Sequence, residues 1–416
     1  MSHPVRLTRA LVLAGALALV PASAAQAAVG DISTVAGTGT QGLSGDGGPA
    51  VSAQLRFPIG VAPLPGGGYL VADQVNNRVR RVNGSGTITT VAGTTAGFSG
   101  DGGPATAAQM SAPSDVAVLP DGSILISDSN NNRIRKIDTS GIITTVAGTG
   151  AAAFSGDGGP ASAAAIRFPF GIDASPDGSY LIADVDNHRI RQVSPTGFIS
   201  TVAGTGVAGY GGDGGSATSA AARLNTPFDV SFISATDFLI ADRNNQRIRK
   251  VQDGILSTVA GTGVASSTGD GGAAVDATLF SPSGVLALSD GGFLVSDTGS
   301  NRVRRVSPSG TIAAFAGTGV QGGAGDGGPA TSAGPSGYNF MTVPAALRSI
   351  ASNCRTMTTF LSIVGQSATT SVMSLCLAGR ANICASSTPS RALKSATRTG
   401  LICIATVSPA SVHRAT

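Results

Sequence analysis

The sequence contains no tryptophan and no glutamate, and its four cysteines all follow residue 353. Between residues 28 and 337 it has a single histidine, His188. Zinc sites need several histidine or cysteine ligands, and a Ser-His-Asp triad needs a histidine base, which only His188 would supply. The composition therefore leaves most enzyme mechanisms without their usual residues.

Charged residues are scarce and unevenly placed. All 23 acidic residues are aspartates at or before Asp326, whereas seven of the 27 basic residues lie in an acid-free tail after residue 337. Two more basic residues belong to the N-terminal segment, which leaves 18 positive against 23 negative charges in between, a net charge of −5. Nucleic-acid binding uses a basic face and aromatic rings for stacking, so this region is poorly suited to it.

The N-terminal segment has one apolar run, residues 10–20, which is about half of the ~20 residues needed to span a bilayer. Arg6 and Arg9 precede this run, and small residues ending in Ala27 and Ala28 follow it. The pattern predicts a cleavable secretory signal over residues 1–27. We expect the mature protein to have no transmembrane segment and to be secreted or extracytoplasmic.

Three phrases recur along the rest of the chain: Thr-Val-Ala-Gly, Ser-Gly-Asp-Gly-Gly-Pro-Ala and Phe-Pro-Ile-Gly-Val, with variations. The valine of the first phrase returns every 55 to 57 residues, and a phenylalanine replaces it in the sixth copy. The six positions are Val35, Val91, Val146, Val202, Val259 and Phe315. Units too short to bury a core alone, at so steady a spacing, predict a repeat architecture.

Each repeat is predicted to contain four short strands. In the first full unit they cover residues 60–64, 69–73, 78–82 and 87–92, with tight Gly-rich turns after the first and third strands. Glutamate and lysine, which favour helices, are scarce, and this also favours strands over helices. Four antiparallel strands repeated about six times predict an all-β fold, a six-bladed β-propeller.

Each unit also carries the phrase Asp-x-x-Asn-x-Arg, with serine for asparagine in the fifth copy, directly after its second strand. The copies begin at Asp73, Asp128, Asp184, Asp242 and Asp297. Together with the Gly-Asp-Gly-Gly-Pro-Ala insert, they resemble NHL repeats and are most similar to those of secreted bacterial NHL proteins and of the teneurin NHL propeller. The resemblance implies a propeller scaffold, usually used for binding, and names no ligand.

The repeat boundaries predict how the ring closes. The chain starts on a fourth strand, residues 31–37, which would join the last three strands and remove two open sheet edges. We expect the propeller to span residues 28–337, although the match to the repeat fails after Gly337. The tail, residues 338–416, is then a degenerate sixth blade, a separate segment with two disulfides, or the product of a reading-frame slip. The four cysteines are Cys354, Cys376, Cys384 and Cys403.

The glycine-rich loops carry one aspartate in every repeat: Asp46, Asp101, Asp157, Asp213, Asp270 and Asp326. A calcium ring is one hypothesis for them, because hard cations prefer several oxygen ligands. A single aspartate per loop supplies too few ligands, so we favour a structural role in which the aspartate bonds nearby backbone amides and Gly-Pro-Ala begins a short helix, such as residues 104–109. We predict no cofactor, with calcium as the alternative.

The arginines of the Asp-x-x-Asn-x-Arg phrases would suit a ligand ring for carboxylate or phosphate. They are Arg78, Arg133, Arg189, Arg247 and Arg302. A feature present in every blade is more simply explained as building the blade, by a bonding network of Asp with Arg or Asn. Function is then expected where blades differ, and those residues are Phe170, His188, Tyr210, Arg223 and Arg243. His188 replaces the asparagine of other repeats, and no catalytic or metal-binding set is identified.

Strand alternation places the Asp-x-x-Asn-x-Arg turns and the long glycine-rich loops on one face. We expect this face to bind a protein, peptide or glycan, and we predict an exported interaction module that does not bind nucleic acid. The alternative is a calcium-dependent propeller hydrolase or lyase. Propeller lyases and lactonases that resemble this fold rely on His or Glu around a channel metal, for which this region has no obvious counterpart.

Overall fold

The computed structural model describes residues 30–334, 358–365 and 370–377. The chain divides into two units, Met1–Ala378 and Gly379–Thr416, and the second lies wholly outside the described residues. The predicted signal segment 1–27 and the cysteine pairing predicted for the tail also lie outside them. All of the described residues belong to the first unit.

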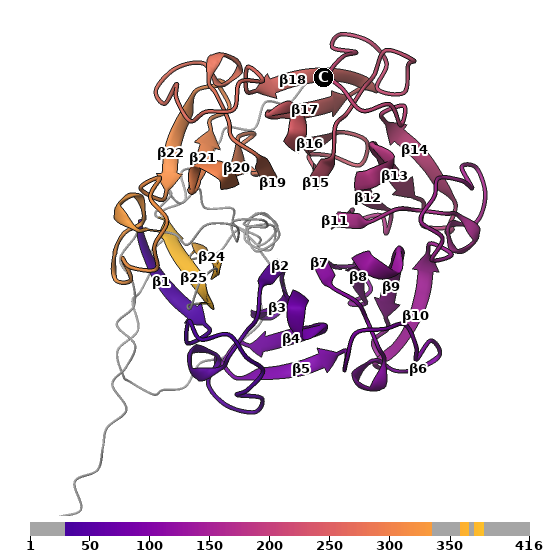
Figure 1. The fold of residues 1–416 in the computed structure, drawn as a ribbon, viewed down its shortest axis with the longest axis vertical. Coiled ribbons are helices and arrows are strands. Elements are labelled where there is room, and N and C mark those ends of the chain that lie inside the picture. The colour runs from indigo at the N-terminus through magenta and orange to yellow at the C-terminus, as the bar shows by residue number, and fades with distance from the viewer. Residues whose placement is uncertain (1–29, 335–357, 366–369, 378–416) are drawn as a thin grey trace, which may run out of the picture. The chain divides into compact units, whose positions relative to one another are not determined.

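Five sheets each contain four antiparallel strands that are consecutive in sequence. We call them blades 1 to 5, and in Figure 1 they follow one another around a central axis with their first strands innermost. Blade 1 consists of β2 (Pro58–Pro63), β3 (Gly68–Asp73), β4 (Arg78–Asn83) and β5 (Ile88–Ala92). Blade 2 is β7 (Pro113–Val118), β8 (Ile124–Asp128), β9 (Arg133–Ile137) and β10 (Ile142–Ala147), with the short β6 (Gly103–Pro104) added at its edge.

The remaining blades repeat this order. Blade 3 is β11 (Pro169–Ala174), β12 (Tyr180–Asp184), β13 (Arg189–Val193) and β14 (Ile199–Ala203). Blade 4 is β15 (Pro227–Phe232), β16 (Phe238–Asp242), β17 (Arg247–Gln252) and β18 (Ile255–Ala260). Blade 5 is β19 (Pro282–Ala287), β20 (Phe293–Asp297), β21 (Arg302–Val306) and β22 (Ile312–Ala316). The all-β propeller prediction is confirmed, and the strands predicted for the first unit match blade 1 to within two residues.

A sixth sheet has the order β23 (Gly328–Pro329), β1 (Asp31–Ala36), β25 (Thr370–Leu377) and β24 (Thr358–Gly365). The N-terminal strand β1 pairs antiparallel with β25, as a fourth strand does with a third in the complete blades. In the described residues this sheet has no counterpart of a first strand. The structure therefore establishes five complete blades, and the prediction of six is not confirmed.

In the part of the chain that is described, all helical segments are single 3-10 turns of three residues. One kind follows each second strand, such as η2 (Gln74–Asn76), and another lies in the glycine-rich loops, such as η1 (Ala50–Ser52). The short helix predicted over residues 104–109 is reduced to η3 (Ala105–Ala107). Within these same residues no helix is long and apolar enough to cross a membrane.

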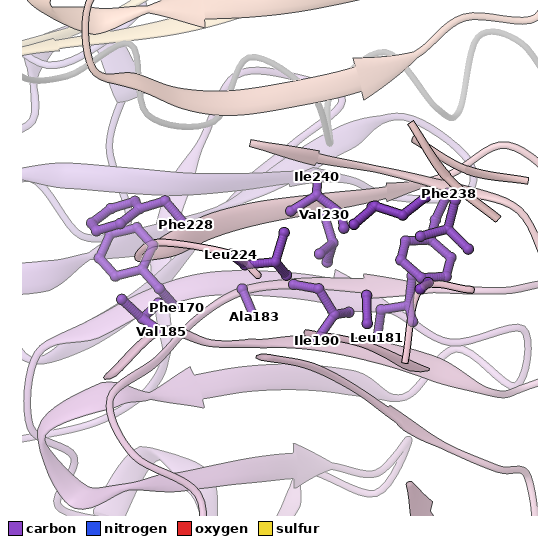
Figure 2. Close-up of a cluster of buried hydrophobic side chains, with 14 of the residues drawn as sticks. Phe170, Leu181, Ala183, Val185, Ile190, Leu224, Phe228, Val230, Phe238 and Ile240 are labelled. Carbon is purple, nitrogen blue, oxygen red and sulfur yellow. The ribbon is translucent and has the colours of Figure 1, made fainter. Parts of the chain in front are cut away.

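The hydrophobic core is built between neighbouring blades. Strands alternate inward and outward side chains, so each blade buries residues on both faces against the blades beside it. Figure 2 shows the cluster between blades 3 and 4, where Leu181 and Ile190 of blade 3 pack with Ile240 of blade 4 and with Leu224 of the loop before blade 4. Each blade therefore buries its apolar side chains only when a neighbouring blade packs against it, and the stability of the scaffold depends on these contacts between adjacent blades.

Candidate functional site

The glycine-rich loops and the turns after the second strands lie together on one face of the scaffold. In blade 1, Nδ2 of Asn76 donates a hydrogen bond to the carbonyl of Gly42 in the preceding loop, at 2.7 Å. The same side-chain bond recurs at Asn131, Asn187 and Asn245. The geometry agrees with the face expected from strand alternation, and it joins each loop to its blade.

A buried arginine in the third strand holds each loop aspartate. In blade 1, Nε and Nη2 of Arg80 lie 3.1 and 2.7 Å from Oδ1 of Asp46, and Nη1 lies 3.4 Å from Oδ2 of Asp73. The Arg80 and Asp73 side chains are fully buried. Thr90 donates to the other oxygen of Asp46 at 2.7 Å. A buried charge needs partners on all sides, and this network provides them.

The network repeats in all five complete blades. Its arginines are Arg80, Arg135, Arg191, Arg249 and Arg304, and all five are fully buried. In blade 5, Ser300 and Ala314 stand where the other blades have asparagine and threonine. The loop aspartates are therefore bound to arginine in these blades, and the expectation that they bond backbone amides is wrong. The helix-like turn lies beside the aspartate but does not bind it.

Burial changes the pKa of the aspartate at the end of the second strand. Loss of water raises the pKa of Asp73 to about 6, although Asn76, the backbone N–H of Arg56 and Arg80 all stabilise the charged form. Burial likewise raises the pKa of Asp184, Asp242 and Asp297 to about 6. These carboxyls serve the packing of each turn rather than a reaction at the surface.

The arginine that completes this network is not the one singled out from the sequence. Arg78 donates from Nη1 to the carbonyl of Asn76 at 2.8 Å, and no bond between Arg78 and Asp73 is found in the described residues. The expected Asp–Asn contact is present, with Nδ2 of Asn76 2.8 Å from Oδ2 of Asp73. The second arginine of each Arg-x-Arg pair was missed, although its recurrence in every repeat was a visible signal.

A further set of bonds joins consecutive blades. In blades 1 to 4, the residue after the 3-10 turn that follows the second strand accepts a hydrogen bond from the backbone N–H that precedes the next first strand. Oδ1 of Asn77 accepts from Ala112, and Oδ1 of Asn132 accepts from Phe168. His188 occupies this place in blade 3, and its Nδ1 accepts from Thr226 at 3.1 Å. Burial lowers the pKa of His188, which keeps the acceptor nitrogen unprotonated. His188 thus replaces asparagine as an acceptor, in a structural position.

Buried carboxylates lie on the inner wall, where the first strands meet, and two of them occupy the same position in their strands. Asp115 accepts hydrogen bonds from the N–H of Val116 and of Ile172 in the next blade, both at 2.9 Å. Asp229 likewise accepts from Val230 at 2.8 Å and from Val285 at 2.9 Å. Burial, and then the charge of Asp115, raise the pKa of Asp229 well above its ordinary value. These inner aspartates bridge blade 2 to 3 and blade 4 to 5.

Glycine is required beside these carboxylates. A Cβ on Gly171 would lie 2.4 Å from Oδ1 of Asp229, and one on Gly60 would lie 2.6 Å from Oδ1 of Asp115. The alternation of glycine and aspartate along the inner wall is therefore a packing pattern. In the described residues no group of three or more His, Cys, Asp or Glu is placed to hold a metal ion.

The blade-specific residues do not form a single cluster. Phe170 packs against Phe228 with ring centroids 4.0 Å apart, and the guanidinium of Arg243 lies 4.5 Å over the Phe228 ring. Arg223 lies in the glycine-rich loop before blade 4, and its carbonyl accepts a bond from Arg249. Phe170 and Arg243 thus both contact the ring of Phe228, which the sequence analysis did not select. All of these contacts are made with the protein itself.

Exposed aromatic rings occupy the same place in three successive loops. They are Phe98, Phe154 and Tyr210, and they are 40, 39 and 47% exposed. The guanidinium carbons of Arg133, Arg189 and Arg247 lie 3.7, 3.6 and 3.8 Å from the respective ring centroids. The stacking positions each ring at the surface. We call this set the aromatic platforms.

Each platform arginine also links two loops. Arg133 stacks on Phe98 of the loop before blade 2, while its Nη2 donates at 2.6 Å to the carbonyl of Thr149 in the loop after that blade. Arg189 and Arg247 make the same bond to Thr205 and Thr262. These three arginines of the hypothesised ligand ring therefore donate to the protein itself. Of the platform rings, only Tyr210 was selected from the sequence, although Phe98 and Phe154 precede the same Gly-Asp-Gly-Gly phrase.

These features define the class of protein: an all-β propeller whose long loops are tied to their blades by repeated Asp–Arg networks. Comparison with known proteins agrees. Residues 94–154, from the loop before blade 2 to Phe154, match the model of the teneurin NHL domain. Over these residues the chain is similar to the NHL domain of teneurins.

Relatives and solved structures give the extent of this similarity. Teneurin-1 of Mus musculus is 30% identical over 254 residues, which is 52% of this chain and 9% of that protein. Teneurin-m of Drosophila melanogaster is 30% identical over 171 residues, 38% of this chain and 6% of that protein. The chain thus matches less than a tenth of the length of these relatives.

Among solved structures, a protein of unknown function from Bacteroides thetaiotaomicron has a TM-score of 0.58 at 15% identity, covering 83% of this chain and 75% of that one. An auxiliary nutrient binding protein from Bacteroides ovatus has a TM-score of 0.54 at 13% identity, covering 82 and 75%. At such identities the likeness concerns the fold alone.

Proposed function

We propose that the protein is an exported NHL-propeller interaction module that binds a protein, peptide or glycan on the face that carries the glycine-rich loops. The observation that carries this proposal is the row of aromatic platforms. Aromatic side chains that are exposed yet fixed in orientation contribute strongly to binding, because little side-chain entropy is lost when a partner covers them.

The surroundings of the platforms favour a protein or peptide among these ligands. Val207, Val264 and Val320 protrude from the loops before blades 4 and 5 and from the loop after blade 5, and they are at least half exposed. Apolar, aromatic and arginine side chains together are the composition of protein interface centres. The net charge of −5 between residues 28 and 337 supports a partner that is not a nucleic acid.

The proposal needs no metal ion. In the five complete blades each loop aspartate is held by a guanidinium group, as Asp101 is by Arg135 at 2.7 Å. A calcium ion at that carboxylate would face the positive charge of the arginine. No observation in the described residues favours the hydrolase or lyase alternative.

Export and ring closure complete the proposal. The charged and apolar N-terminal segment supports secretion through a cleaved signal. Strand β1 pairs with β25, and β23 pairs with β1 in the way that β6 pairs with β10 in blade 2. These pairings support a sixth blade shared between the N-terminal strand and strands β24 and β25 of the tail. Such closure would protect the open edges of blades 1 and 5.

The experiment compares ligand selection by the full chain and by a variant with Phe98, Phe154 and Tyr210 all changed to alanine. A displayed-peptide library and a glycan array are screened with both proteins. We expect the wild type to select a consensus peptide, with affinity reduced at least about tenfold in the variant, a loss of roughly 1.4 kcal/mol. Selection on the glycan array alone would identify a sugar as the ligand class.

The matched control is Phe198→Ala. Phe198 is 52% exposed and lies in the turn between the third and fourth strands of blade 3, where its backbone pairs with that of Pro160, and it is not one of the aromatic platforms. Its removal should leave binding unchanged. Equal affinity of the wild type and the triple variant for every selected ligand, with both proteins folded, would refute the proposed surface.

A further inference from the structure

Five glycine-rich loops of this protein bind a guanidinium group with the same atoms. In the loop before blade 5, Nε and Nη2 of Arg304 donate to Oδ1 of Asp270 at 3.0 and 2.7 Å. Nη1 donates to the carbonyl of Thr278 at 2.8 Å, and Nη2 to that of Thr268 at 3.1 Å. One carboxylate and two carbonyls therefore form an arginine site in each loop.

The loop after blade 5 has the same backbone. Gly328 donates to the carbonyl of Gly325 at 3.1 Å, as Gly272 does to Gly269 at 3.1 Å. The two bonds that fix the loop to its neighbouring strand also recur. Gly327 N–H to Ile32 O and Ala330 N–H to Gly30 O are both 2.8 Å, equal to the corresponding bonds of Gly271 and Ala274 in the loop before blade 5.

Asp326 occupies the place of Asp270 in this sixth loop. The carbonyls of Ala324 and Gly334 stand at the sequence positions of Thr268 and Thr278. In the described part of the chain no hydrogen bond or ion pair is found for the Asp326 carboxylate, whereas each of its five counterparts binds an arginine.

The register of the sixth sheet explains the difference. In blade 5, Arg304 lies opposite Ala314, and its neighbour Val303 lies opposite Ala316. In the sixth sheet the corresponding partners of Thr34 and Ala36 are Met373 and Val372. Methionine stands at the register position of the buried arginine, and it has no N–H group to donate.

We infer that the sixth loop is a binding site for an arginine side chain of a partner protein, formed by the carboxylate of Asp326 and the carbonyls of Ala324 and Gly334. This inference goes beyond the proposed function, because it does not involve the aromatic platforms. The five intramolecular examples specify the ligand. In all five, Nη2 reaches one carboxylate oxygen and Nη1 reaches a carbonyl, and in three of them Nε also reaches that carboxylate oxygen. An ammonium group lacks this planar fork.

The surface around Asp326 suits a protein as the source of the arginine. Val320, in the same loop, is 69% exposed. A partner that covers this valine would exclude water from the neighbouring ion pair and strengthen it. The acidic charge of the region between residues 28 and 337 also attracts a basic partner.

The test follows backbone amides in nuclear magnetic resonance spectra of the isotope-labelled full chain, titrated with N-acetyl-arginine amide. We expect saturable shifts at Gly325, Gly327 and Gly328. The citrulline analogue has the same shape without the charge and should cause none. The lysine analogue should bind at least about tenfold more weakly, because it has the charge without the fork.

Two variants separate a specific site from general attraction. Asp326→Asn should abolish the arginine-induced shifts. Asp276→Asn removes the same charge from an exposed residue of the preceding loop and should leave them unchanged. A Phe154→Ala variant should also bind arginine normally, which distinguishes this site from the proposed interaction surface.

Four outcomes would overturn the inference. Equal shifts with arginine and lysine would indicate charge screening alone, and shifts that persist in Asp326→Asn would place the arginine elsewhere. Lack of binding to the folded full chain would mean that Asp326 is already covered. The intact mass of the expressed protein is measured first. If the mass differs from that of the printed sequence, the C-terminal peptides are sequenced. An arginine at the position of Met373 would also refute the inference, since the chain would then supply its own arginine.

Discussion

The guanidinium of Arg80 lies 2.7 Å from the carboxylate of Asp46, 34 residues earlier in the chain, and 3.4 Å from that of Asp73. Asp46 belongs to a surface loop and Asp73 to the end of a buried strand. One side chain therefore fixes the long loop to the strand beneath it. Repetition of this contact in five blades gives the loop face its regular shape, on which the platforms and the Asp326 site stand.

Replacing the buried arginine should cost far more stability than replacing its neighbour. Arg135→Met leaves the buried Asp128 without its charged partner, and we expect a loss of about 3 kcal/mol in the free energy of unfolding. Arg133→Met removes a stacked surface arginine and should cost about 1 kcal/mol. Urea denaturation measures both. Equal losses would contradict the assignment of the structural role to the second arginine.

Blade 5 offers a stabilising substitution. Four blades have a threonine that donates to the loop aspartate, as Thr258 does to Asp213 at 2.7 Å, but blade 5 has Ala314 at this register position. Ala314→Thr should add this bond to Asp270 and raise the free energy of unfolding by about 1 kcal/mol. Ala313→Thr, on the opposite side of the strand, controls for strand propensity. Equal stabilisation of both variants would show that the hydrogen bond from residue 314 to Asp270 does not contribute to stability.

His188 should make stability fall in mild acid. Its folded pKa lies below the ordinary value of 6.5, so the unfolded chain binds the proton more tightly. The stability it contributes is present above pH 6.5 and is lost as the pH falls through the folded pKa, because protonated Nδ1 no longer accepts from Thr226. His188→Asn keeps a hydrogen-bond acceptor that does not titrate. The free energy of unfolding of this variant, measured by urea denaturation at several pH values, should therefore vary less over this pH range. An unchanged pH dependence in the variant would argue against the contact.

Asp229 should make stability depend on pH in the opposite direction to His188. Its folded pKa is raised above the ordinary 3.8, so the folded state holds the proton more tightly. Its contribution to stability is largest at low pH and decreases as the pH rises from about 3.8 through the folded pKa. Asp229→Asn should weaken that decrease in denaturation experiments, whereas the exposed Asp276→Asn should not. A variant that keeps the full slope would show that another group titrates.

Much of the fold was accessible from the sequence because its signals are local and repeated. The spacing of Val35 and its successors, and the strands around Asp73, predicted a four-stranded blade and its boundaries. The face that carries the loops followed from alternation alone. The number of blades did not, because the sequence after Gly337 has no repeat signal, and five complete blades are what the structure establishes.

The candidate site was predicted less well. Arg78 and Arg80 are two residues apart in one strand and chemically identical, and only the position of the folded loop decides which of them binds Asp46. The exposure of the Phe98 and Phe154 rings follows from the folded loops, and no residue pattern in the sequence specifies it. The inner aspartates Asp115 and Asp229 are likewise recognisable only once neighbouring first strands are in place.

The sequence alone determined that this is a repeat β-propeller, that its loops each carry one aspartate, and that His188 varies an asparagine position. These properties depend on residue type and spacing. Only the tertiary structure decided which arginine each aspartate binds, which rings reach the surface, and that Asp326 stands apart from its five counterparts. The physical reason is that such contacts join residues about 34 positions apart, across strand pairs whose register no local pattern specifies.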